Sequence, residues 1–197
     1  MIEKNSFQVY IKAMFITGEK KMYFTSTRDD LKVTAAQAVA QGISSEGGLF
    51  VPSGFPAVSS EKLAELVNMN YKERAAAILS SFLTDFTPAE VEYCVNGAYT
   101  GTFDNDAPAP VFSLDDSRHI LELWHGPTCA FKDLALQILP FLLTVSAKKS
   151  APDKQIVILV ATSGDTGKAA LAGFADVPGT SIVVFFPRNG APFRGVL

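Results

Sequence analysis

The chain has 197 residues, of which 48% are apolar and 19% are charged, with 17 basic and 20 acidic side chains and a formal net charge of −3. This composition excludes a disordered, collagen-like or low-complexity chain, and the length suffices for one or two domains with a substantial core. The slight acidity also argues against a nucleic-acid-binding protein, which usually presents a basic face.

Neither a membrane span nor a metal site is expected. The longest apolar stretch, Leu134 to Ala147, contains Gln137 and Pro140 and is shorter than the roughly 18 residues of a spanning helix. The two cysteines and two histidines do not have a metal-binding spacing. We therefore expect a soluble cytoplasmic protein that binds neither a membrane nor a metal ion.

The N-terminal half is predicted to consist of an extension over residues 1–21 and a mostly helical domain over residues 22–100. A turn at residues 46–48 leads into a short extended segment that ends at Pro52. Apolar side chains then recur at helical spacing from Ser60 to Leu83, with a break around residues 68–70.

Local signals mark where two helices of this domain begin. Thr34 and Gln37 have the spacing of a capping box, in which each side chain bonds a free N–H of the other residue. Thr87 and Glu90 repeat that spacing around Pro88, a residue that favours the first helical position. We therefore expect helices to begin just after Thr34 and just after Thr87.

A segment rich in Asp, Asn and Pro, residues 101–110, is predicted to link this domain to a second one over residues 111–197. In the second domain, residues 155–162 and 181–186 are apolar runs, typical of strands buried on both faces of a parallel sheet. A helical pattern over residues 168–175 lies between them and completes a βαβ unit. The expected fold class is α/β: a helical N-terminal domain followed by the start of a parallel-sheet domain.

The loop that follows the first apolar run contains two glycines. Its residues are Ser163, Gly164, Asp165, Thr166 and Gly167. Free N–H groups and the dipole at a helix start favour an anion there, and ligands of open α/β sheets usually bind outside the carboxyl ends of the strands. The alternative is a tight connection in which Ser163 or Asp165 only caps the helix. A P-loop is excluded, because Thr162 and Ala169 stand where that motif needs Gly and Ser or Thr.

The segment from His125 to Asp133 is predicted to form a turn and then a helix, capped by Thr128 and running over about residues 129–148. Lys132 would lie near the first helical turn, where the dipole disfavours a cation and apolar neighbours favour the neutral amine. A neutral lysine amine is what covalent chemistry on a carbonyl requires. The alternative is an ordinary lysine whose head reaches water and pairs with Asp133.

Four segments, in this order, make the chain similar to the threonine synthase family. They read YFTSTR at residues 23–28, EGGLFVP at 46–52, HGPTCAFKD at 125–133 and ATSGDTG at 161–167. The third and fourth together are highly specific. Threonine synthases are pyridoxal-phosphate (PLP) enzymes of fold type II, and the similarity implies that this chain carries the N-terminal portion of that fold, with the parallel-sheet domain incomplete.

The resemblance also implies an activity and roles for individual residues. Members of the family are carbon–oxygen lyases that convert O-phosphohomoserine and water to threonine and phosphate. By resemblance, Lys132 would hold PLP covalently and move protons, and Asp165 would lie beside the cofactor ring. The substrate carboxylate would be received by the loop of Ser163, Gly164, Asp165, Thr166 and Gly167.

Threonine synthases are substantially longer than this chain, so we expect an N-terminal part with weak or no activity alone. One alternative is a non-catalytic fragment that pairs with a complementary C-terminal segment. Another is a related phospholyase that acts on a different phosphorylated amino acid. An anion-binding βαβ module without covalent chemistry is the remaining alternative.

Overall fold

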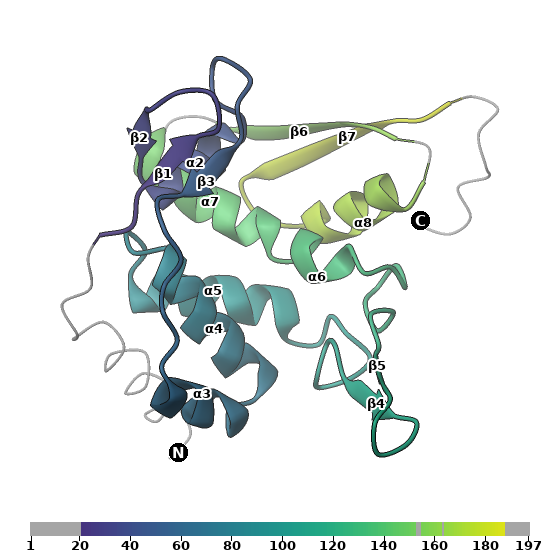
Figure 1. Ribbon diagram of the computed structural model, residues 1–197. Coiled ribbons are helices and arrows are strands. Elements are labelled where there is room, and N and C mark those ends of the chain that lie inside the picture. Colours follow the sequence, from purple (N-terminus) through teal and green to yellow (C-terminus); the bar gives the residue numbers. More distant parts are fainter. Residues whose placement is uncertain (1–20, 153–154, 163, 188–197) are drawn as a thin grey trace. The chain divides into compact units, whose positions relative to one another are not determined.

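The structure is a computed structural model that describes residues 21–152, 155–162 and 164–187 (Figure 1). These residues divide into two compact units. The first contains residues 21–96 and 145–152, and the second contains residues 97–144 with the described residues from 155 onward. Residues 1–20 of the expected extension lie outside the described residues, and the domain boundaries at residues 100 and 110 stay a prediction.

The first unit contains a small antiparallel sheet in the strand order β2-β1-β3. Its strands are β1 (Phe24–Ser26), β2 (Lys32–Val33) and β3 (Phe50–Pro52). The expected extended segment that ends at Pro52 is confirmed as β3. The sheet as a whole was not predicted, because strands of two or three residues are too short to display an alternating pattern.

Helices make up the rest of the first unit and begin where the sequence predicts. They are α2 (Ala35–Gln41), α3 (Ser60–Val67), α4 (Tyr71–Phe82) and α5 (Pro88–Tyr99), the last of which continues into the second unit. Thr34 forms the expected capping box with Gln37, since each accepts a hydrogen bond from the other's backbone N–H. Thr87 does the same with Glu90.

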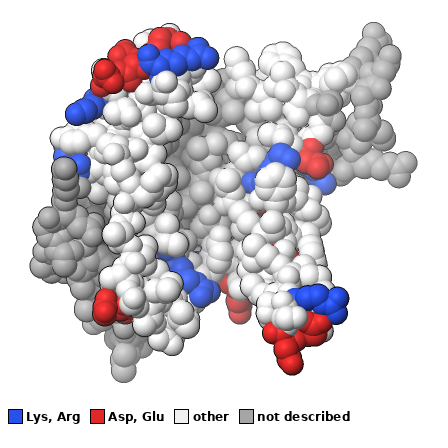
Figure 2. Space-filling model, viewed as in Figure 1, with Lys and Arg blue, Asp and Glu red and all other residues white. Residues whose placement is uncertain are grey.

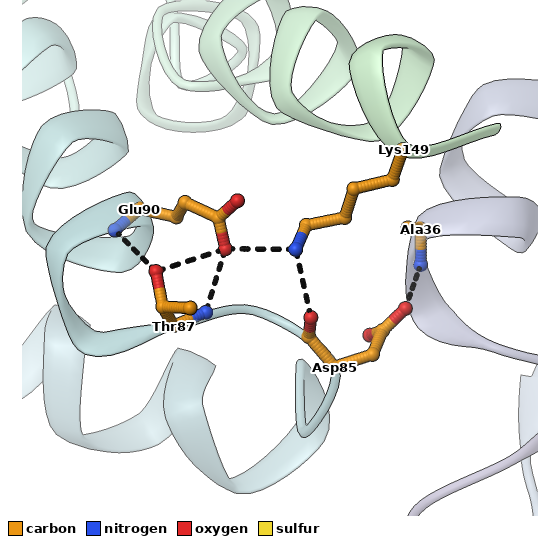
Figure 3. A network of polar contacts seen from close by, with 5 residues as sticks. All are labelled: Ala36, Asp85, Thr87, Glu90 and Lys149. Carbon is orange, nitrogen blue, oxygen red and sulfur yellow. Dashed lines mark hydrogen bonds and ion pairs between the residues drawn. The ribbon is translucent and has the colours of Figure 1, made fainter. Parts of the chain in front are cut away.

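The end of α7 (Leu139–Ser150) belongs to the first unit and is tied to it by Lys149 (Figure 3). The Lys149 amine lies 2.9 Å from a Glu90 carboxylate oxygen and donates to the Asp85 backbone carbonyl at 3.0 Å. The Asp85 carboxylate accepts a 3.0 Å hydrogen bond from the N–H of Ala36, in the first turn of α2. One polar network therefore joins α2, α5 and α7.

The second unit contains a hairpin and a βαβ unit. The hairpin pairs β4 (Val111–Ser113) with β5 (His119–Leu121). A short helix, α6 (Asp133–Leu136), precedes α7. The βαβ unit consists of β6 (Ile156–Ala161), α8 (Asp165–Phe174) and β7 (Thr180–Phe185), with β6 and β7 paired in parallel.

The expectation that β6 and β7 are buried on both faces is wrong for the described structure. Burial alternates along each strand, and Leu159 and Phe185 are 69% and 59% exposed. The reason is that α8 packs against both strands and so covers one face, while the apolar side chains of the other face are exposed. Neither strand contains a charged residue, and the surface over them carries no charge in Figure 2.

None of the helices in the described ranges has the length and apolar character that crossing a lipid bilayer requires.

Candidate active site

The residues before Lys132 form a turn instead of the expected helix. The Cys129 N–H donates to the Gly126 carbonyl at 3.0 Å, and Cys129 has a φ of 56°, in the left-handed region that costs a non-glycine residue free energy. The first helical residue is Asp133, and the helix is interrupted again at residues 137–138 before α7 begins. The predicted continuous helix over residues 129–148 is therefore wrong.

Asp133 explains why the helix does not begin at Thr128. The Asp133 side chain is fully buried, and its two oxygens accept from the Thr128 N–H at 2.8 Å and the Thr128 hydroxyl at 2.7 Å. The Ala130 N–H points to the same carboxylate at 3.5 Å. The Thr128 hydroxyl is thus used to hold a turn and does not cap a helix. The Asp133 carboxylate faces this turn and is not the surface partner of Lys132 that the alternative interpretation requires.

Lys132 immediately precedes α6, at the N-cap position. Its side chain is half-buried, and the amine nitrogen lies 4.4 Å from the centroid of the Phe131 ring. A lysine amine at this distance above an aromatic face is attracted by the ring electrons. Lys132, a half-buried residue, therefore presents a single amine at the end of a defined turn.

The glycine-bearing segment after β6 begins α8 three residues earlier than predicted. Asp165, Thr166 and Gly167 form the first helical turn, and Gly164 is the N-cap. Among the described residues no side chain caps this helix, and Asp165 is its first helical residue, so the alternative in which Asp165 serves as the cap is wrong; Ser163 lies outside the described residues. A helix start without a side-chain cap keeps N–H groups available for another acceptor.

The two glycines of this segment have different structural roles. A Cβ atom at Gly164 would meet no atom within 4 Å, so the backbone is open on that side. A Cβ atom at Gly167 would lie 1.8 Å from the Thr162 methyl carbon, so glycine is needed there for contact with the preceding strand. Of the two, only Gly164 leaves open space beside the start of α8.

The helices that follow these two segments, α6 and α8, pack against each other (Figure 1). A Cβ atom at Gly173 would lie 2.1 Å from the Leu136 carbonyl oxygen, so glycine allows the two backbones to approach closely. This contact lies at the last residue of α6 and near the end of α8, whereas Lys132 and Asp165 stand at the starts of the two helices.

A cluster around His125 was not predicted. One ring nitrogen of His125 lies 2.6 Å from an Asp104 carboxylate oxygen and the other lies 2.8 Å from a Glu122 oxygen. Hydrogen bonds to Glu122 and Asp104 raise the pKa of His125, because both ring nitrogens can donate only when the ring is protonated. Trp124 is 49% exposed and stacks on the His125 ring. Asp104 is too distant in sequence for any local pattern to reveal this cluster.

Comparison with known proteins gives a consistent result for sequence and structure. Residues 23–99 match the family model "Threonine synthase N terminus". The chain is 40% identical over 184 residues to "Threonine synthase-like 1" of Homo sapiens, covering 85% of this chain and 24% of that protein. It is 39% identical over 159 residues to "Threonine synthase" of Escherichia coli (strain K12), covering 80% of this chain and 35% of that one.

The crystal structure of PLP-bound threonine synthase from Brucella melitensis matches with a TM-score of 0.81 and 35% sequence identity. The match covers 87% of this chain and 37% of that one, so this chain spans between 24% and 37% of the length of these three proteins. In sequence and in fold, the chain corresponds to the N-terminal portion of the threonine synthases.

Proposed function

We propose that this chain supplies the lysine-bearing part of a threonine synthase-type active site, in which Lys132 binds PLP covalently. The observation that carries the proposal is the placement of Lys132: a half-buried lysine at the end of a turn that a buried carboxylate fixes. The similarity to a PLP-bound threonine synthase supports the same assignment. PLP, when bound, supplies an electron sink that stabilises carbanions of the substrate.

The start of α8 fits the second part of such a site. No side chain of a described residue caps its first turn, although the Gly164 N–H donates to the Thr162 hydroxyl at 3.3 Å, and the positive end of the helix dipole favours an anion. We propose that Gly164, Asp165, Thr166 and Gly167, together with Ser163, receive the carboxylate of the substrate, and that Asp165 lies beside the cofactor ring. Because α6 packs on α8, the amine and the anion site begin on two connected helices.

Borohydride reduction tests the assignment of Lys132. The chain is incubated with PLP, reduced, digested, and mapped by mass spectrometry. We expect the pyridoxyl label on the peptide that contains Lys132, and we expect Lys132→Ala to lose it. Lys148→Ala serves as the matched control, because Lys148 is an exposed lysine at the other end of the neighbouring helix. A label spread over many lysines, or retained in Lys132→Ala, would contradict the proposal.

The proposed reaction is the conversion of O-phosphohomoserine and water to threonine and phosphate. Because the chain spans only part of each protein that it matches, we expect little or no threonine from the chain alone. A related phosphorylated amino acid is the alternative substrate, since proteins named threonine synthase and threonine synthase-like are equally similar to this chain. A panel of phosphorylated amino acids, assayed for phosphate release by a full-length relative that carries residues 21–187 of this chain, separates the two.

The exposed face of β6 and β7 favours a second, compatible role as a partner of another polypeptide. Parallel sheets are almost always covered on both faces, and here the uncovered face is apolar except for Ser181 and has no charged side chain on either strand. We propose that this face pairs with the complementary C-terminal part of a threonine synthase. Co-expression with that part, followed by size-exclusion chromatography, should give a soluble complex.

A further inference from the structure

The buried carboxylate of Asp133 has a role that the proposed chemistry of Lys132 does not assign. A carboxylate removed from water is costly unless donors replace the lost water. For Asp133 the donors are the N–H and hydroxyl of Thr128, with the Ala130 N–H at a longer distance. Because it is buried, the Asp133 carboxylate depends on the donors of this turn.

The turn needs such support because it contains a strained residue. Cys129 has a positive φ, and its two neighbours, Thr128 and Ala130, are the residues that donate to Asp133. Strained backbone of this kind persists only where the surroundings hold it in place. Asp133 thus bonds the turn on both sides of its strained residue.

Gly126 leaves the space that this arrangement requires. A Cβ atom at Gly126 would lie 2.4 Å from the Asp133 Cβ and 2.5 Å from an Asp133 carboxylate oxygen. Any larger residue would displace the carboxylate from Thr128. The glycine that opens the turn and the aspartate that follows it therefore depend on each other.

Lys132 is held on both sides of its own backbone. On its N-terminal side, the Asp133 N–H donates to the Ala130 carbonyl at 3.0 Å and closes the turn. On its C-terminal side, the Lys132 carbonyl accepts from the Leu136 N–H at 2.9 Å in α6. The direction in which the Lys132 side chain leaves the backbone is thus set by the turn that Asp133 holds.

We propose that Asp133 is a positioning residue for Lys132: by binding Thr128 and Ala130 it fixes the turn from which the lysine amine is presented to its carbonyl partner. The inference rests on the proposed function of Lys132. Asp133 acts through the backbone and through Thr128, and its carboxylate oxygens face the turn.

Competitive acylation of the lysines tests this without any cofactor. Limiting acetic anhydride is added to the folded chain, and the acetylation of Lys132 is measured by mass spectrometry relative to Lys148 in the same sample. Loss of one hydrogen bond that fixes the turn gives the half-buried Lys132 side chain more freedom, so we expect the Lys132 to Lys148 ratio to rise about threefold in Thr128→Val. Thr128→Ser retains the hydroxyl and should keep the wild-type ratio.

Asp133→Asn should raise the same ratio, and Asp115→Asn is its matched control. Asp115 also accepts backbone N–H groups in a turn, between β4 and β5, but that turn does not precede Lys132. If Asp133→Asn fails to fold, the comparison of Thr128→Val with Thr128→Ser tests whether the turn positions Lys132, because both variants leave the Asp133 carboxylate in place. An unchanged ratio in Thr128→Val would overturn the inference, since a merely structural role lowers stability without changing the relative reactivity of Lys132.

Covalent labelling with PLP and borohydride separates this inference from the proposed function. We expect the Lys132 label to fall about tenfold in Thr128→Val and to return in Thr128→Ser. No label in the wild type, with the acylation ratio still raised in Thr128→Val, would refute the proposed function and keep the positioning role. A wild-type level of label in Thr128→Val would refute the positioning role alone.

Discussion

Lys149 makes three separate contacts within the first unit. Its amine contacts the Glu90 carboxylate and the Asp85 backbone carbonyl (Figure 3). The amine also lies 5.6 Å from the centroid of the Phe86 ring. Burial acts to raise the pKa of Glu90, but hydrogen bonds from Thr87 and Lys149 outweigh it and leave the pKa below its usual value. The Lys149 cation and the Glu90 anion therefore support each other.

The neighbouring lysine gives a matched test of this network. We expect Lys149→Met to lower the free energy of unfolding by about 1 kcal/mol, because a partly shielded ion pair and a hydrogen bond are lost while the apolar stem remains. Lys148→Met, at an exposed position one residue earlier, should change it by less than about 0.5 kcal/mol. Urea unfolding measures both, and equal effects of the two substitutions would show that the network contributes nothing specific.

The hydrogen-bonding role of a residue was predictable where it depends only on residues within four neighbouring positions. The pairs Thr34 with Gln37 and Thr87 with Glu90 form the capping boxes that their spacing indicates. Thr128 has the same chemistry but bonds Asp133 instead, because a buried carboxylate competes for its hydroxyl. The sequence pattern does not show whether a threonine hydroxyl will cap a helix or bond a buried carboxylate.

At the scale of elements, His125 connects residues 101–110 to the segment that follows β5. Asp104 binds the His125 ring, and its N–H also donates to the His125 carbonyl at 3.0 Å. Glu122 binds the other ring nitrogen. The His125 side chain is 13% exposed, whereas Asp104 is 72% exposed, so the ring is shielded and its Asp104 partner lies at the surface. The irregular segment is thereby attached to the second unit at two points.

This connection predicts a dependence of stability on pH. Because the pKa of His125 is raised in the folded state, its contribution is fully present below the unfolded-state value near 6.5 and is lost as pH rises through the folded-state value. The free energy of unfolding should therefore decrease above pH 6.5, and amide exchange in residues 101–110 should become faster.

The contribution of His125 is isolated by substitution. His125→Gln should remove this part of the pH dependence, whereas His119→Gln, in the exposed hairpin, should retain it. Urea unfolding between pH 6 and pH 9 provides the measurement. The same slope in wild type and His125→Gln would show that another group is responsible.

Element positions were predictable from periodicity, and element boundaries less so. The spans of α3, α4, β6 and β7 agree with the apolar pattern to within a residue or two. α8 begins earlier than predicted because its polar first turn, from Asp165 to Gly167, resembles a loop in composition. The small sheet of β1, β2 and β3 depends on pairing between distant segments, which periodicity does not report.

At the scale of the whole molecule, the two faces of the β6–β7 sheet differ in what they contact. Leu159 and Ile158 are neighbours on opposite faces, and only Leu159 is strongly exposed. Leu159→Lys should therefore leave the free energy of unfolding within about 0.5 kcal/mol of wild type, whereas Ile158→Lys should lower it by about 2 kcal/mol, because a charge would be placed against α8.

Self-association provides the second measurement for this pair of substitutions. An exposed apolar face with unpaired strand edges favours contact between copies of the chain. Light scattering coupled to size-exclusion chromatography should show less self-association for Leu159→Lys than for wild type, together with loss of the complex with the C-terminal part of a threonine synthase. Equal self-association of wild type and Leu159→Lys would show that the surface responsible for self-association is not the exposed face of β6 and β7.

The fold class was predictable at this scale because alternation of strands and helices and the four family segments agree. The burial of the β6–β7 sheet was not predictable, because an apolar run indicates where a strand is without showing how many of its faces are covered. Leu159 and Ile158 look alike in sequence, and only the position of α8 distinguishes them.

The discontinuity of the first unit has a consequence for the time at which it is completed. Lys149 reaches Asp85 across 64 residues of chain. A ribosome adds about 5 to 20 residues each second, so roughly 3 to 13 seconds pass between the synthesis of these two partners. In that interval α6 is made, while Glu90 still lacks its cation. The first unit is therefore finished only after part of the second unit has been made, and its closure waits for the end of α7.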